Sequence, residues 1–130
     1  MKKFISSICI LAICFSLNNC IAQTQSYNQK SVFMVRHSVI FKLKTSLDSA
    51  EVLNFFNAAK KLANIPGVQN FEALKQTSKK NKFEYGLSME FATDELYNQY
   101  TNHPDHENFV QQYWLKNVED FLEIDYSSLK

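Results

Sequence analysis

The sequence predicts an α+β fold in which helices cover one face of a single antiparallel sheet. Segments 35–43 and 83–91 alternate apolar and polar residues with a period of two, which is typical of half-buried strands. Outside these segments, apolar residues recur at the three- and four-residue spacing of amphipathic helices. With 130 residues, one domain is expected. The elements follow the order β-α-β-β-α-β, the split βαβ arrangement.

The two alternating segments define the expected strand faces. In "VRHSVIFKL", Val35–Leu43, the apolar residues share one face with His37, so this histidine is expected to point toward the core. In Phe83–Phe91, aromatic and aliphatic residues alternate with Glu, Gly and Ser. This second segment gives the clearest strand of the chain.

The first helix is expected to begin at Asp48, which can cap it while Glu51 completes a capping box. It is expected to end before the Pro-Gly pair at 66–67. Segment 68–78 then gives a second strand with weaker alternation, and the lysine-rich stretch 79–82 gives a solvated turn.

The second helical region is expected to be divided in two. Thr93 can cap a short first helix, and Pro104 suits the first position of a second one, which makes His103 its N-cap. His106 then falls on the helix face that must point inward. That face also carries Phe109, Val110 and Tyr113. Alternation over 122–126 gives a final strand, and the sheet face away from the helices needs cover by a partner.

The N-terminus is expected to be an export signal over residues 1–22. Two lysines precede an apolar run, 4–17, that is too short to span a bilayer comfortably. Cleavage after Ala22 would give a periplasmic or secreted protein. Alternatively, "LNNC" resembles a lipobox, with Cys20 as a lipid anchor.

The rest of the chain divides into a flexible tether, 23–31, and a domain over 32–130. All three cysteines lie in the leader, so neither a disulfide nor a cysteine-bound zinc is expected in the domain. A formal net charge of +1 without a basic stripe argues against nucleic-acid binding. Two glycines form no phosphate-binding loop, and no cofactor is predicted.

Three short motifs, in order, resemble a known family. "MVRHSVIFKLK", "IPGV" and "YTNHPDH" followed by a phenylalanine are similar to the stress-responsive dimeric α/β-barrel family, called Dabb, over about residues 33–126. The resemblance implies a ferredoxin-like fold whose protomers pair sheet to sheet as a homodimeric barrel. Such pairing would cover the apolar faces of 35–43 and 83–91.

The resemblance also implies site residues. The strand histidine of the family falls on His37, the tyrosine before the HPxH motif on Tyr100, and the motif histidines on His103 and His106. Cyclase-type members use the counterparts of His37, Tyr100 and His106. A further tyrosine of those members aligns near Ala59, so the pocket differs there.

These residue types suit acid–base chemistry on a small, largely apolar or aromatic ligand. His106, near a helix N-terminus and on an apolar face, is expected to be neutral and to act as general base. Tyr100 would stabilise an oxyanion, and His37 would orient the reactants. The structural alternative assigns His103 to capping and His37 and Tyr100 to the core.

Three functional classes therefore stay open. The first is a cleft that binds a small, largely apolar molecule, with cyclase- or lyase-like chemistry as an extension of that binding. The second is a non-catalytic dimeric module, and the third a monooxygenase- or haem-related barrel. A metal site is not predicted, because no carboxylate has an expected place beside the histidines.

Overall fold

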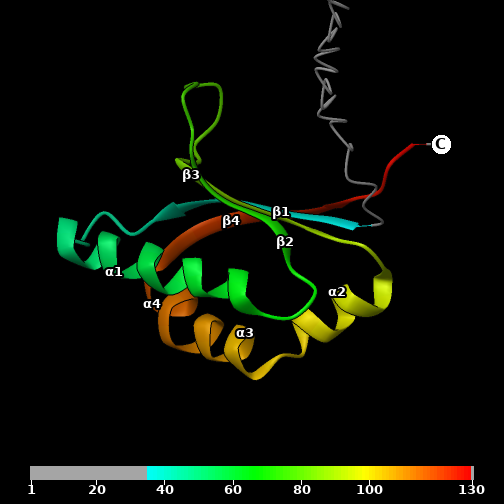
Figure 1. Cartoon of the computed structure of the whole chain (residues 1–130). Coiled ribbons are helices and arrows are strands. Elements are labelled where there is room, and N and C mark those ends of the chain that lie inside the picture. The colour runs from blue at the N-terminus through cyan, green and yellow to red at the C-terminus, as the bar shows by residue number, and fades with distance from the viewer. Residues whose placement is uncertain (1–34, 130) are drawn as a thin grey trace, which may run out of the picture.

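A four-stranded antiparallel sheet in the order β2-β3-β1-β4 organises the chain in the computed structural model, which describes residues 35–129. Helices cover one face of this sheet only (Figure 1). The strands are β1 (Val35–Leu43), β2 (Gln69–Lys75), β3 (Tyr85–Phe91) and β4 (Val118–Tyr126). The helices are α1 (Ser49–Lys60), 3₁₀ helix η1 (Lys61–Asn64), α2 (Asp94–Thr101), α3 (Pro104–Phe109), π turn η2 (Val110–Trp114) and α4 (Leu115–Asn117). The expected fold class is confirmed.

The predicted leader, 1–22, and tether, 23–31, lie outside the described residues. Within residues 35–129, no helix combines the length and the apolar character needed to cross a bilayer.

Local sequence signals explain where the helices begin. The Asp48 side chain accepts hydrogen bonds from the backbone of Ala50 and Glu51, and the Glu51 side chain accepts one from the Asp48 backbone, which forms the expected capping box. Thr93 caps α2 in the same way. His103 caps α3, where its Nδ1 accepts a hydrogen bond from the Asp105 backbone N–H at 3.2 Å.

The core lies between the sheet and the helices. Phe41 on β1, Phe91 on β3 and Phe55 on α1 are each 0% exposed. Phe41 and Phe55 pack ring against ring with centroids 5.6 Å apart. This aromatic packing fixes α1 on the helical face of the sheet.

The strand boundaries differ from the sequence expectation. β2 is shorter than the predicted 68–78, and β3 begins at Tyr85 rather than Phe83. Asn70 adopts a left-handed conformation (φ 49°), and the β2–β3 register shifts there, which disrupts the alternation expected of β2. β4 already begins at Val118, where α4 ends.

One expectation about the sheet faces is wrong. The apolar faces of segments 35–43 and 83–91 do not await a partner, because the chain's own helices bury them. The uncovered apolar surface is on the opposite face. It consists of Ile40, Leu74, Leu122, Ile124 and Tyr126, and we call it the bare face. Leu74, Leu122 and Tyr126 are each about half exposed (47–49%).

Candidate functional site

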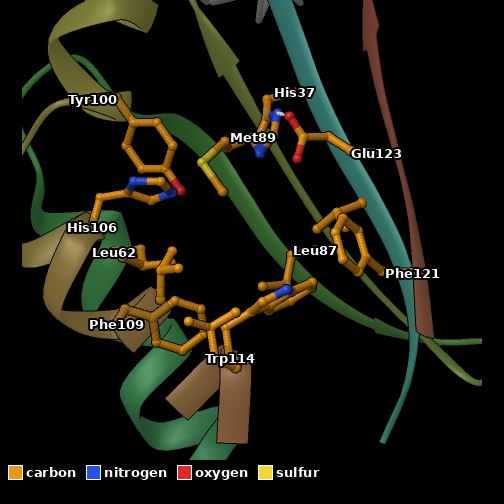
Figure 2. A pocket seen from close by; sticks show the side chains of 13 residues that line it. His37, Leu62, Leu87, Met89, Tyr100, His106, Phe109, Trp114, Phe121 and Glu123 are labelled. Atoms are coloured by element: carbon orange, nitrogen blue, oxygen red, sulfur yellow. Dashed lines mark ion pairs between the residues drawn. The ribbon is translucent and has the colours of Figure 1, made fainter. Parts of the chain in front are cut away.

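A cavity of about 240 Å³ lies between the sheet and the helical layer. Its walls are mostly apolar and come from η1, β3, α3, η2 and β4. They include Leu62, Leu87, Met89, Phe109, Trp114 and Phe121. Four polar side chains also line it: His37, Tyr100, His106 and Glu123. Figure 2 shows these four around the upper part of the cavity, above the apolar floor.

His37 is held by a carboxylate on the neighbouring strand. β1 and β4 pair in a register that sets His37 opposite Asp125. The His37 Nδ1 lies 2.8 Å from Asp125 Oδ1, and the Tyr97 hydroxyl donates to Asp125 Oδ2 at 2.8 Å. Because a carboxylate only accepts, Nδ1 carries the proton of a neutral His37. Its Nε2 is then a free acceptor that faces the cavity (Figure 2).

Glu123 lies two residues before Asp125 on the same face of β4. Its Oε1 is 4.0 Å from His37 Nδ1, and half of its side-chain surface is exposed. The carboxylate therefore lines the cavity from the β4 side while still contacting solvent.

Tyr100 forms the α2 side of the cavity. It is 1% exposed, and its ring packs against Phe91 (centroids 5.1 Å apart) and His106 (4.6 Å). Burial raises the pKa of Tyr100, and the negative charge of Glu123 adds to this effect. The side chain is therefore a phenol, a hydrogen-bond donor, at any physiological pH.

His106, on α3, is half-buried and lines the same cavity. Its Nδ1 lies 3.1 Å from the Thr101 carbonyl oxygen, so a neutral His106 carries its proton on Nδ1 and has an accepting Nε2. Burial lowers the pKa of His106 below its usual value, as expected from its apolar helix face. At neutral pH it is a neutral imidazole.

The structure thus brings His37, Tyr100 and His106 together at one cavity. His103 is not among the lining residues and caps α3, as the structural alternative assigned it. The π turn η2 contributes two lining residues, Val110 and Trp114. Such turns often occur at functional sites.

Sequence reasoning missed the carboxylates beside His37. The expectation that no carboxylate lies near the histidines is corrected by Glu123 and Asp125. One possible metal-ligand atom from each of His37, Glu123 and Asp125 lies within 4.8 Å of the others, a spacing that a cation could bridge. The hydrogen bond between His37 and Asp125 already satisfies two of these three side chains. Only strand register places them together, because His37 and Asp125 are 88 residues apart.

Comparison with solved structures identifies relatives along the whole described domain. The chain is 46% identical to a Dabb family protein with a ferredoxin-like fold from Mesorhizobium loti, with a TM-score of 0.71. The match covers 75% of this chain and 99% of that one. No match to a curated protein sequence was found.

More distant structures share the fold alone. A dimeric ferredoxin-like protein from Bacteroides fragilis is 24% identical, with a TM-score of 0.59, and the match covers 73% of this chain and 96% of that one. The hydroxynitrile lyase of Passiflora edulis is 15% identical, with a TM-score of 0.69, and the match covers 77% of this chain and 97% of that one.

Residues 35–128 match the Dabb family, described as the stress responsive A/B barrel domain. The chain belongs to this family.

Proposed function

We propose that this protein is an exported homodimeric barrel that binds a small, largely apolar molecule in the cavity of each protomer, with cyclase- or lyase-like acid–base chemistry at His106. The observation that carries this proposal is the convergence of His37, Tyr100 and His106 on one apolar cavity. Apolar pockets with a few convergent polar groups are the usual form of small-molecule sites.

The cavity volume favours a ligand of modest size. About 240 Å³ is below the usual range for drug-sized ligands, and about 150 Å³ is enough for benzene. A single-ring aromatic or short aliphatic molecule therefore fits best. The same volume disfavours the haem-related alternative, because a haem macrocycle is much larger.

The polar groups suit proton abstraction next to a carbonyl. Neutral His106 offers Nε2 as a base, and the Tyr100 phenol can donate to the oxygen on which negative charge develops. Asp125 fixes the orientation of the His37 ring, and the Nε2 atom of His37 adds a second hydrogen-bond acceptor that faces the cavity. This arrangement supports enolisation, the first step of an aldol-type closure.

Two observations support homodimerisation. The bare face exposes apolar side chains, and the removal of such side chains from water is favourable. The related protein from Bacteroides fragilis is described as dimeric. A two-fold pairing of bare faces would bury these side chains and close the barrel.

A cavity-filling variant tests binding. Val110 lines the cavity and is half-buried on η2, so Val110→Phe should block it. Val52→Phe is the matched control, a half-buried helical valine away from the cavity. Toluene binding, followed by fluorescence of Trp114, the chain's one tryptophan, should saturate in the wild type and the control and disappear in Val110→Phe. Saturable binding that survives in Val110→Phe would argue against the cavity.

Deuterium exchange tests the chemistry separately. Acetophenone is small and apolar and has enolisable methyl protons. In D₂O the wild type should accelerate their exchange, as seen by proton NMR, while His106→Ala should fall to the buffer rate. Acetophenone binding without accelerated exchange would contradict the acid–base chemistry and leave ligand binding alone as the function.

The export part of the proposal rests on the leader sequence. Mass spectrometry of the protein from its native cells should show a chain beginning at Gln23, or a lipid-modified Cys20. A mature protein that still carries Met1 would contradict both.

A further inference from the structure

The carboxylate of Glu123 is unexpected in a mostly apolar wall. On the helix-facing side of β4 it follows Phe121, and it lies opposite Val39 of β1. Both neighbours line the cavity, and an aliphatic side chain at this position would continue their surface. A carboxylate here instead gives the cavity a charge, and the sign of that charge limits which ligands can enter.

Acidic side chains outnumber basic ones on the β4 side of the cavity. Carboxylate oxygens of Glu123 and Asp125 both lie within 4.0 Å of the Nδ1 atom of one histidine, His37. Among the described residues that line the cavity there is no lysine or arginine.

Two lysines near β4 bind other carboxylates of that strand. Lys42 pairs with Glu119 at 3.2 Å, and Lys82 pairs with Asp120. Neither lysine lines the cavity, so neither offsets Glu123 there.

Hydrogen-bonding capacity points the same way. The Nδ1 atoms of both His37 and His106 donate to protein oxygens, which leaves two Nε2 acceptors. Glu123 adds two acceptor oxygens, whereas the lining side chains with a donor are the Tyr100 hydroxyl and the Trp114 indole N–H (Figure 2). The cavity therefore offers more acceptors than donors and best satisfies a ligand that itself donates.

We propose that Glu123 makes this cavity bind neutral or cationic small molecules, above all those with a hydrogen-bond donor such as an alcohol, phenol or amine, and makes it exclude carboxylates. The inference rests on the proposed binding function and adds the substrate class. A like charge at the binding site acts against the wrong ligand rather than for the right one.

Four probes of similar size separate charge from fit: toluene, benzyl alcohol, benzylammonium and benzoate. Their dissociation constants are measured by Trp114 fluorescence at pH 7.5 and low salt, in the wild type, Glu123→Gln and Glu119→Gln. Glu119 is the matched control, because it lies on β4, is as exposed as Glu123 (48% against 50%) and does not line the cavity.

In the wild type, benzoate should bind on the order of tenfold more weakly than benzyl alcohol, as expected for one partly screened like charge. Glu123→Gln should remove most of this difference and weaken benzylammonium, and of the four probes it should affect the uncharged toluene least. Glu119→Gln should behave as the wild type. Added salt should narrow the gap between benzoate and benzyl alcohol in the wild type and in Glu119→Gln, but not in Glu123→Gln.

Two outcomes would overturn the inference. If benzoate binds the wild type as well as benzyl alcohol does, or if Glu123→Gln keeps the discrimination, Glu123 does not select the ligand. Toluene binding in that case would preserve the proposed function. If none of the four probes binds, the binding function fails and this inference fails with it.

Discussion

The two faces of the sheet are built from the same strands but have different surroundings. On the helix-facing side, Val39, Phe41 and Leu87 are between 0 and 6% exposed. On the bare face, Leu74 of β2 and Leu122 of β4 are almost half exposed. The helical layer therefore completes the core of the protomer and lines the cavity, whereas the bare face is the surface that the proposed homodimer would bury.

The bare face is not uniformly apolar. Glu90 is 5% exposed, forms an ion pair with Arg36 and accepts a hydrogen bond from Asn70 Nδ2 at 2.6 Å. A buried charge held this way costs stability when its partner is removed. The helix-facing side therefore contains the packed core of the protomer, whereas the bare face combines exposed apolar side chains with one buried ion-paired carboxylate.

The largest effect is expected on the helix-facing side. Phe41→Ala removes a ring that packs against Phe55, Phe56, Tyr85 and Trp114. Truncating such a buried ring should lower the free energy of unfolding by about 3–5 kcal/mol. Urea denaturation measures this loss. A loss below about 1 kcal/mol would mean that the core is not where the structure puts it.

On the bare face, the expected effect is on assembly. Leu122→Asp places a charge beside Ile40 and Ile124 on the bare face and should weaken the homodimer at least about tenfold, since a charge is costly to bury in an interface. Light scattering over a concentration series measures the dissociation. The control is Leu53→Asp at a 60% exposed leucine of α1. A wild type that is monomeric at micromolar concentration would refute the assembly, as would equal effects of both variants.

A smaller effect separates the two histidines of the HPDH motif. His103→Ala should cost about 1 kcal/mol of stability through the lost helix cap and leave toluene binding intact. His106→Ala should change ligand binding and abolish acetophenone exchange in a dimer that still folds. Urea denaturation measures the stability of each variant, and Trp114 fluorescence measures its toluene binding, so the two together separate the roles of the two histidines. If His103→Ala alone impairs binding, the roles are assigned the wrong way round.

The smallest effect is a pH dependence from His106. Because burial lowers its folded-state pKa below 6.5, the unfolded chain binds more protons as the pH falls below that value. Stability is therefore full above about pH 6.5 and is lost below it until the folded-state pKa is reached. Urea denaturation of the wild type and of His106→Gln between pH 7.5 and 5 should show that the variant loses less free energy of unfolding as the pH falls. A difference in stability between the two proteins that does not change with pH would contradict this prediction.

Local elements were predictable because their signals are local. The capping box of Asp48 and Glu51, the His103 cap and the alternation of β1 each depend on residues within a few positions. The family resemblance then directed attention to His37, Tyr100 and His106, which do line one cavity.

Long-range features were not predictable in this way. Asp125 reaches His37 only through the β1–β4 register, and Tyr97 joins them from α2. The alternation of a strand shows that it has two faces, but not which of them the helices cover. The charge that Glu123 adds to the cavity was missed for the same reason.

The central claim is that the cavity on the helix-facing side binds a small apolar molecule, while the bare face serves assembly. Methyl NMR with toluene tests this in one experiment. We expect saturable shifts at the methyl groups of Leu62 and Leu87, which line the cavity, and none at Leu74 and Ile124 of the bare face. Shifts confined to Leu74 and Ile124, or no saturable shift at all, would contradict the account.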